Sequence, residues 1–440
     1  MRIGVLGVYR PQFDQKAANE AVVNVQQAVA GVPDAESVSL PMIDEWQAEA
    51  VISQMNSALQ SLDVLVVAMG TFVGADVVLK VSRLVSCPII LWTLPEPQAG
   101  GVRLSLNSLC GGLLTNHAFK RMGIEMPVIY GDPRALATRE RLASILRAER
   151  AKAKLHATTI GIVGRHPPGY YPCDYDELEL NRRLGVKVRT IGLEEAFLAA
   201  DQVEEASLIE PRRVAQGLAG LSQIDEPARA KSLRAELGLR QLIRDQGLSA
   251  VAVECWPDYM TEYGGAVCWA MSRLIDDGLM AGCEADVHGT LTMIMCRELG
   301  GESPFFGDLV HVAGEDRLVF WHCGAAPLSL AGETPRASVH PNRKVGLTLD
   351  FALKGGPATA LRLHHDGDGL SLIAIEGEAV ADSLYFSGNT ASLSTVRPAA
   401  NVLQALIADG AEHHFAVGYG VKLADVESLG EALGMAVHVY

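Results

Sequence analysis

The chain has 440 residues and a formal net charge of −15, and 49% of its residues are hydrophobic. That length exceeds what one hydrophobic core usually organises, so two or three domains are expected, and no apolar run reaches the roughly 18 residues of a membrane-spanning helix. The negative charge argues against nucleic acid and anionic membranes as partners, because both are bound through clustered Lys and Arg.

The first part of the chain alternates strand-like and helix-like segments. Fully apolar runs at residues 3–8, 64–69 and 88–92 are separated by segments of helical length. This βα pattern is typical of a parallel sheet covered by helices, and we expect an N-terminal α/β domain over residues 1–155. The opening MRIGVLGVYRPQFD indicates a strand rather than a secretory leader, so a soluble cytoplasmic protein is expected.

A second α/β domain is predicted over residues 156–318. It begins with the apolar strand in TTIGIVG and continues through strands at 186–191 and 250–254. Helical patterns at 227–246, 263–277 and 289–299 accompany these strands. The two domains together predict parallel sheets of the Rossmann or flavodoxin-like kind.

The last part of the chain changes to short alternating segments such as VGLTLDFAL, ATALRLHHD and LSLIAIEGEAV, which are interrupted by Gly, Asp and Asn. Such segments favour hairpins, so we expect a C-terminal antiparallel β-barrel-like domain over residues 319–440. A helix at 423–433 and a strand at 435–439 are predicted to close the chain.

Several familiar motifs are missing. GIVGRHPPG does not satisfy G-x-G-x-x-G, and neither a phosphate-binding G-x-x-x-x-G-K-[ST] loop nor a G-x-S-x-G nucleophile occurs. The eight cysteines are dispersed without a C-x-x-C pair, which predicts buried reduced thiols. A nucleotide-dependent oxidoreductase is therefore disfavoured.

Carboxylates gather at two strand ends. In AGCEADVHGTLTMIM, Glu284 precedes a helix whose N-cap we assign to Asp286. In FFGDLVHV, Asp308 lies between aromatic residues and an apolar strand, where a lone carboxylate needs a partner. That partner is either a cation or a hydrogen bond within a turn.

Histidines supply the next candidates. His413 and His414 are adjacent at the start of a strand, where neighbouring side chains point to opposite sides, so at most one is expected to face a shared metal ion. The pair His364 and His365 has equal local merit. His322 follows an apolar strand in LVFWHCG, as a residue at a pocket edge or as a core histidine.

At these residues the chain resembles the L-fucose/L-arabinose isomerase family. CEADVHGTLTM is similar to the family motif that opens on a metal-binding glutamate, which implies that role for Glu284. The resemblance implies Asp308 as the second carboxylate ligand, His414 in AEHHFAVGYG as the third ligand, and His322 as a possible further one. It also implies a homo-oligomer, either a trimer or a hexamer.

The resemblance extends to the substrate pocket. Arg10 in YRP is similar to a substrate-binding arginine of the family, and VECWPDY implies substrate contacts for Glu254 and Trp256. From the residues alone, a surface salt bridge for Arg10, a salt-bridged strand end and a core indole are open alternatives. His413 and His322 are expected to line the same pocket.

These residues suit an aldose–ketose isomerase that acts through an enediol. Two carboxylates and an imidazole form a mixed oxygen and nitrogen site suited to Mn²⁺, with Mg²⁺ or Co²⁺ as substitutes. Glu284 and Asp308 are expected to be catalytic as acid and base, and His322 or His413 to relay the proton of ring opening. The alternatives are a metal-assisted sugar lyase or epimerase and a non-catalytic sugar-binding protein.

Overall fold

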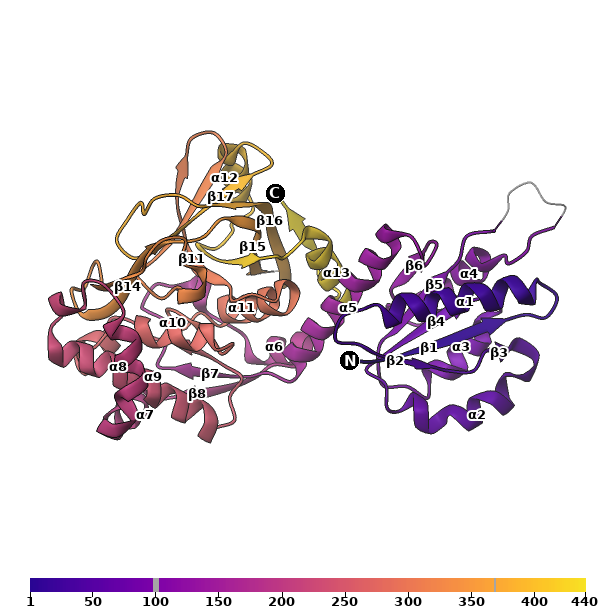
Figure 1. Ribbon diagram of the computed structural model, residues 1–440, viewed down its shortest axis with the longest axis horizontal. Coiled ribbons are helices and arrows are strands. Elements are labelled where there is room, and N and C mark those ends of the chain that lie inside the picture. The colour runs from indigo at the N-terminus through magenta and orange to yellow at the C-terminus, as the bar shows by residue number, and fades with distance from the viewer. Residues whose placement is uncertain (98–102, 368) are drawn as a thin grey trace. The chain divides into compact units, whose positions relative to one another are not determined.

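The structure is a computed structural model that describes residues 1–97, 103–367 and 369–440 (Figure 1). The chain forms two compact units, Met1–Glu149 and Arg150–Tyr440. Across the described residues, none of the helices combines the length and apolar character needed to cross a membrane.

A parallel sheet forms the centre of the first unit, in the order β2-β1-β4-β5-β6 with β3 paired to β1. In β4, Val64 and Val66 belong to one hydrophobic cluster, which also contains residues of α1. Leu65 and Val67 belong to a second cluster with residues of α2 and α3. Because both faces of the sheet are covered, the central strand β4 is apolar and buried throughout. The elements are β1 (Arg2–Tyr9), α1 (Gln15–Ala30), β2 (Glu36–Ser39), β3 (Ile43–Asp44), α2 (Ala48–Leu59), β4 (Val64–Met69), α3 (Ala75–Ser82), β5 (Ile89–Thr93), α4 (Ser108–Arg121) and β6 (Val128–Tyr130).

The second unit opens with another parallel sheet, in the order β10-β9-β7-β8. Helix α5 (Leu136–His156) precedes it along the chain. Its elements are β7 (Thr159–Val163), α6 (Glu177–Leu184), β8 (Lys187–Ile191), α7 (Leu193–Asp201), α8 (Ile209–Gln216), α9 (Glu226–Asp245), β9 (Ala250–Val253), α10 (Cys268–Asp276), β10 (Met280–Gly282) and α11 (Val287–Gly300).

A mixed sheet of nine strands completes the second unit. Strands β17, β12, β11, β18, β15 and β16 each pair antiparallel with two neighbours, and β16 returns to β17, so their pairings form a ring. The ring agrees with the expected barrel, which itself stays a prediction. The elements are β11 (Phe305–Ala313), β12 (Arg317–His322), β13 (Arg336–Val339), β14 (Gly346–Ala352), β15 (Gly356–His365), β16 (Leu370–Val380), β17 (Asn389–Thr395), α12 (Ala399–Ala408), β18 (His414–Tyr419), α13 (Leu423–Leu433) and β19 (Val437–Val439).

One hydrophobic cluster joins helices of the second unit to the nine-stranded sheet. It contains Leu233 of α9 and Trp269 of α10 together with Phe305 and Leu349 of the nine-stranded sheet. That sheet begins at Phe305, before the predicted boundary at residue 318, and the division into three domains stays a prediction. Helix α11 packs against β15 and β18, which brings the loop before α11 next to the start of β18.

Candidate active site

Glu284, Asp308 and His414 converge in the second unit. Glu284 lies in the loop between β10 and α11, whereas Asp308 in β11 and His414 in β18 are directly opposite each other in the antiparallel register. The His414 Nε2 atom lies 3.1 Å from Asp308 Oδ1 and 3.4 Å from Glu284 Oε2. Residues that are up to 130 positions apart in the sequence therefore present their polar atoms to one point.

His413 joins the same group, which corrects the expectation that adjacent histidines face opposite ways. Its Nε2 atom lies 3.6 Å from Glu284 Oε2 and 4.0 Å from Asp308 Oδ1. The alternation rule does not apply because β18 begins at His414, so His413 belongs to the preceding loop. Both imidazoles approach the carboxylates, and their ring centroids are 4.0 Å apart.

Four atoms at this point are buried without a hydrogen-bond partner among the described residues: Glu284 Oε2, Asp308 Oδ1, His413 Nε2 and His414 Nε2. Burying one such atom unsatisfied costs about 1–3 kcal/mol, so four together need a common partner. An octahedral ion with bonds of about 2.1 Å separates neighbouring ligand atoms by about 3 Å, close to the shorter distances here. The four atoms therefore fit a divalent cation.

The backbone of Glu284 is held in an unusual conformation. Its φ angle is 57° and that of Ala285 is 53°, a region that costs a residue other than glycine about 1–3 kcal/mol. The Ala285 amide donates to Val253 O at 2.9 Å, and Trp256 Nε1 donates to Glu284 Oε1 at 2.8 Å. These bonds fix Glu284 with its second oxygen directed toward the imidazoles.

Asp286 orients His414. Its Oδ1 atom accepts from the Gly289 amide at 2.7 Å, which makes Asp286 the expected N-cap of α11. Its Oδ2 atom lies 2.9 Å from His414 Nδ1 and accepts from Arg362 Nη1 at 2.6 Å. A proton on Nδ1 leaves the Nε2 lone pair free to bind a metal ion, as buried carboxylates do for many ligating histidines.

Arg362 is a functional residue that the sequence analysis missed. Its side chain is fully buried, and its Nη2 atom donates to Pro172 O at 3.0 Å while Nε lies 3.6 Å from Glu412 Oε2. Burial opposes ionisation of Asp286, but the Arg362 charge and the His414 bond outweigh it and lower the pKa of Asp286. Asp286 is therefore an anion when it holds His414.

The charges of the protein groups alone favour a proton on His414. Burial opposes the imidazolium, but the nearby carboxylates of Asp286 and Asp308 prevail and raise the pKa of His414 well above its usual range. Burial likewise opposes ionisation of Asp308, but His414 lowers the pKa of this carboxylate. A cation that binds here takes the place of a proton on His414.

His322 lies behind the cluster at the end of β12. Its ring centroid is 6.1 Å from that of His414, and its Nδ1 atom accepts from the Cys323 amide at 2.9 Å. The geometry groups His322 with Cys283 and Cys323 rather than with the carboxylates. Its role as a possible further ligand stays a prediction.

Four buried thiols lie close to the cluster. Cys255 Sγ lies 2.7 Å from Cys283 Sγ, directly before Glu284 in the chain, and Cys268 Sγ lies 3.8 Å from Cys323 Sγ. All four are free and buried, as the sequence predicts, whereas Cys110 is exposed and Cys87 is only partly buried, contrary to that prediction. Burial raises the pKa of Cys255, so this thiol is protonated at neutral pH.

An aromatic wall borders Glu284. The Tyr170 ring meets the Trp256 ring edge-on at 5.4 Å and the His413 ring at 5.8 Å. Neighbouring Cys173 has its thiol within 4.8 Å of ligand atoms of Glu284, His413 and His414, and burial raises its pKa to about 11. Both residues come from the loop after β7, whose GYYPC sequence carries aromatic and thiol side chains at a strand's C-terminal end.

The remaining predicted pocket residues have protein partners. Trp256 is half-buried and bonded to Glu284, so it is no core indole. Glu254 accepts from the Arg165 amide at 2.9 Å. Arg10, in the first unit, donates from Nη2 to Glu45 Oε1 at 2.9 Å and lies over the Phe72 ring. Substrate contacts of Glu254 and Arg10 stay predictions.

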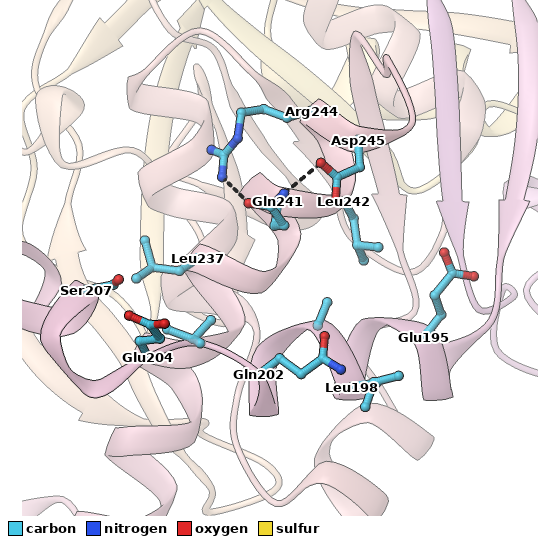
Figure 2. A pocket seen from close by; sticks show the side chains of 12 residues that line it. Glu195, Leu198, Gln202, Glu204, Ser207, Leu237, Gln241, Leu242, Arg244 and Asp245 are labelled. Atoms are coloured by element: carbon cyan, nitrogen blue, oxygen red, sulfur yellow. Dashed lines mark hydrogen bonds between the residues drawn. The ribbon is translucent and has the colours of Figure 1, made fainter.

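In the described part of the second unit, two cavities lie outside this cluster. One of about 570 Å³ between α7 and α9 (Figure 2) is bordered by Gln241, which bonds both Arg244 and Asp245. Another of about 530 Å³ is bordered by His288, His365 and Glu412. Neither is lined by Glu284, Asp308 or His414.

Comparison with known proteins gives close relatives, although no family model matches the chain. A sulfoquinovose isomerase from Alkalicoccus urumqiensis is 35% identical over 379 residues, 85% of this chain and 85% of that protein. A sulfoquinovose isomerase from Clostridium sp. (strain MSTE9) is 31% identical over 398 residues, 88% and 89% of the two chains. An L-arabinose isomerase from Nocardioides sp. (strain ATCC BAA-499 / JS614) is 24% identical over 337 residues, 71% and 66% of the two chains.

An α/β fold with two parallel sheets and a large mixed sheet, with relatives of this coverage, defines an enzyme that interconverts aldose and ketose sugars. The chain belongs to the L-fucose/L-arabinose isomerase-like family, which confirms the resemblance drawn from its motifs. These relatives are enzymes, so the alternative of a non-catalytic sugar-binding protein is not supported.

Proposed function

We propose that the protein is a metal-dependent isomerase whose ion is held by Glu284, Asp308 and His414, with His413 beside them. The observation that carries the proposal is the set of four buried, unpartnered atoms on these residues. The donors are two carboxylate oxygens and imidazole nitrogens, a mixed set suited to Mn²⁺, with Mg²⁺ or Co²⁺ as substitutes. Softer ions prefer thiols: four buried thiols are bonded to one another or to His322 behind this set, and among the described residues only the Cys173 thiol lies beside it, within 4.8 Å of ligand atoms of Glu284, His413 and His414.

The reaction moves a carbonyl group between the first two carbons of the sugar through an enediol. When bound, the ion supplies Lewis-acid polarisation of the substrate oxygens. Glu284 and Asp308 are the acid and base that transfer the carbon-bound proton, a contribution of about 10²- to 10⁴-fold. Trp256 holds Glu284 through its Oε1 atom, so the other oxygen keeps a defined direction.

Ring opening precedes the transfer, and we assign its proton relay to His413. Its side chain is about one-third exposed and lies beside the carboxylates. His322 is fully enclosed, and its Nδ1 atom accepts from the Cys323 amide. We expect His413→Ala to lose activity on the cyclic form of the sugar. We expect His322→Ala to keep this activity.

For the substrate we propose sulfoquinovose, a hexose that carries a sulfonate on its sixth carbon. The sulfoquinovose isomerases share 31–35% identity with nearly the whole chain, whereas the L-arabinose isomerases share 24–26% with a smaller part. This difference favours a sulfonated hexose over a neutral pentose.

The test is incubation of the chain with Mn²⁺ and sulfoquinovose, glucose, L-arabinose or L-fucose in deuterated water. Ketose formation from sulfoquinovose, with deuterium introduced next to the carbonyl, is expected in nuclear magnetic resonance spectra. Glu284→Gln should abolish it. Carbon–carbon cleavage products, or a changed configuration without a ketose, would instead indicate the lyase or the epimerase.

A further inference from the structure

We propose that Arg343 binds the anionic group at the far end of the substrate, and that this contact selects a sulfonated sugar over its neutral counterpart. The inference rests on the proposed isomerase function and extends it, because it assigns a subsite to a residue outside the metal-binding cluster.

The guanidinium of Arg343 lies next to a residue of the active site. Its Cζ atom is 4.7 Å from the centroid of the Trp256 ring, over the ring face. The same indole contacts Glu284 through its edge, where Nε1 donates a hydrogen bond to Glu284 Oε1 at 2.8 Å. The guanidinium and the Glu284 carboxylate thus contact the same indole, one at its face and the other at its edge, an arrangement in which the two groups can address different ends of one substrate.

The turn that carries Arg343 has a defined structure. His340 is buried, and its Nδ1 atom accepts from the amides of Asn342 and Arg343 at 3.3 and 3.2 Å. The Lys344 amide donates to His340 O at 2.9 Å, and Lys344 has a left-handed φ of 58°. A capped turn of this kind presents the Arg343 side chain from a fixed backbone.

The charges around the cluster indicate why a cation is needed at the position of Arg343. Glu284, Asp308 and Asp286 make the cluster acidic, and an anionic sugar needs a compensating cation at its other end. Arg362 is not available as this cation, because it is fully buried and paired with Asp286. Arg343 is exposed, and among the described residues no ion pair joins it to a carboxylate.

Arginine is chemically suited to the task. Its planar group offers several N–H donors in a fork that can bond two oxygens of a sulfonate at once. A cation–π contact with the indole does not in itself use these N–H donors. Lysine would keep the charge but lose the fork.

The experiment compares sulfoquinovose with quinovose, which lacks only the sulfonate, in four proteins with Mn²⁺. Arg343→Met should raise KM for sulfoquinovose about 10- to 100-fold, the loss expected for a charge-assisted contact, and Arg343→Lys should give an intermediate value. For quinovose, kcat/KM should stay within about twofold, as for a surface change remote from the chemistry. Lys344→Met removes another cation from the same turn and is the control. It should leave KM and kcat/KM unchanged for both sugars.

Equal loss with both sugars in Arg343→Met would overturn the proposal, because it would indicate that Arg343 only supports Trp256. An unchanged KM for sulfoquinovose would overturn it as well. If the wild-type protein isomerises neither sugar, the proposed reaction fails, and calorimetric binding then decides on Arg343. Weaker sulfoquinovose binding by Arg343→Met than by wild type supports the subsite, and no binding by wild type overturns it.

Discussion

At the scale of single residues, the proposed metal site depends on which nitrogen of His414 carries the proton. Asp286 holds Nδ1 at 2.9 Å and is itself kept ionised by Arg362. Asp286→Asn removes the charge and allows the amide to donate to Nδ1, which turns the proton toward Nε2. Affinity for Mn²⁺, measured by electron paramagnetic resonance titration, should fall about 10- to 100-fold.

The matched control is Asp276→Asn. Asp276 also accepts backbone amides, those of Leu328 and Ser329, but it has no contact with His414. This variant should bind Mn²⁺ as the wild-type protein does. Wild-type affinity in Asp286→Asn would show that Asp286 acts as a helix cap alone.

His364 gives the protein a pH-dependent contribution to stability. Its Nδ1 atom lies 2.7 Å from Glu412 Oε2, and this bond raises the pKa of His364 above 6.5, with Asp366 adding to the effect and Arg362 opposing it. A raised folded-state pKa gives stability that is complete below the ordinary value and is lost as pH rises through the folded value. The melting temperature of wild type should therefore exceed that of His364→Gln most at about pH 6 and least at about pH 9. A gap that widens with pH would contradict this assignment.

At the scale of elements, helix α11 approaches β11 so closely that Gly289 has no room for a side chain. A Cβ atom there would lie 2.3 Å from the Phe306 ring and 2.8 Å from Asp286 Oδ2. Gly289→Ala should destabilise the protein by about 1–3 kcal/mol and weaken Mn²⁺ binding through the displaced Asp286. Thermal unfolding measures the first effect, and metal titration measures the second.

Gly31→Ala provides the comparison for a helix-associated glycine. Gly31 has ordinary helical backbone angles, and its Cβ would meet only carbonyl oxygens at 3.5 Å. The melting temperature of the Gly31→Ala variant should equal that of the wild-type protein or be slightly higher, because alanine restricts the unfolded chain. If Gly289→Ala behaves in the same way, the close packing of α11 does not limit the site.

Most elements could be predicted from the sequence because their patterns are local. The strand at 64–69 and the helix at 423–433 occur at the predicted residues. The helix predicted at 263–277 begins only at Cys268, because Tyr259–Tyr263 form a π-helical turn packed on Phe197. That packing is tertiary and leaves no periodic signal.

The site was only partly predictable for the same reason. Glu284, Asp308 and His414 are located through the motifs of a known family. Arg362 had no such signal, since it reads as an ordinary strand residue and meets Asp286 across 76 positions of sequence. Register and burial, rather than residue type, make it part of the site.

At the scale of the whole molecule, a bound ion would link two halves of the second unit. Glu284 follows the parallel sheet, whereas Asp308 and His414 belong to the nine-stranded sheet. Mn²⁺ at about 100 times its dissociation constant should stabilise the folded state by about 2.7 kcal/mol, and a chelator should reverse this. Calorimetry should show that Mn²⁺ raises the melting temperature of the wild-type protein and does not raise that of Glu284→Gln. An equal shift in both proteins would place the ion elsewhere.

The ring of paired strands has a consequence for how this enzyme could diversify. A slip of one residue in β11 or β18 would turn Asp308 or His414 away from the cluster, but a strand with neighbours on both sides has little freedom to slip. The turn at residues 340–344 lies outside these six strands, so a change in the Arg343 side chain there does not alter their register. Evolution can therefore change which sugar is accepted by altering that turn, while the reaction chemistry is inherited intact.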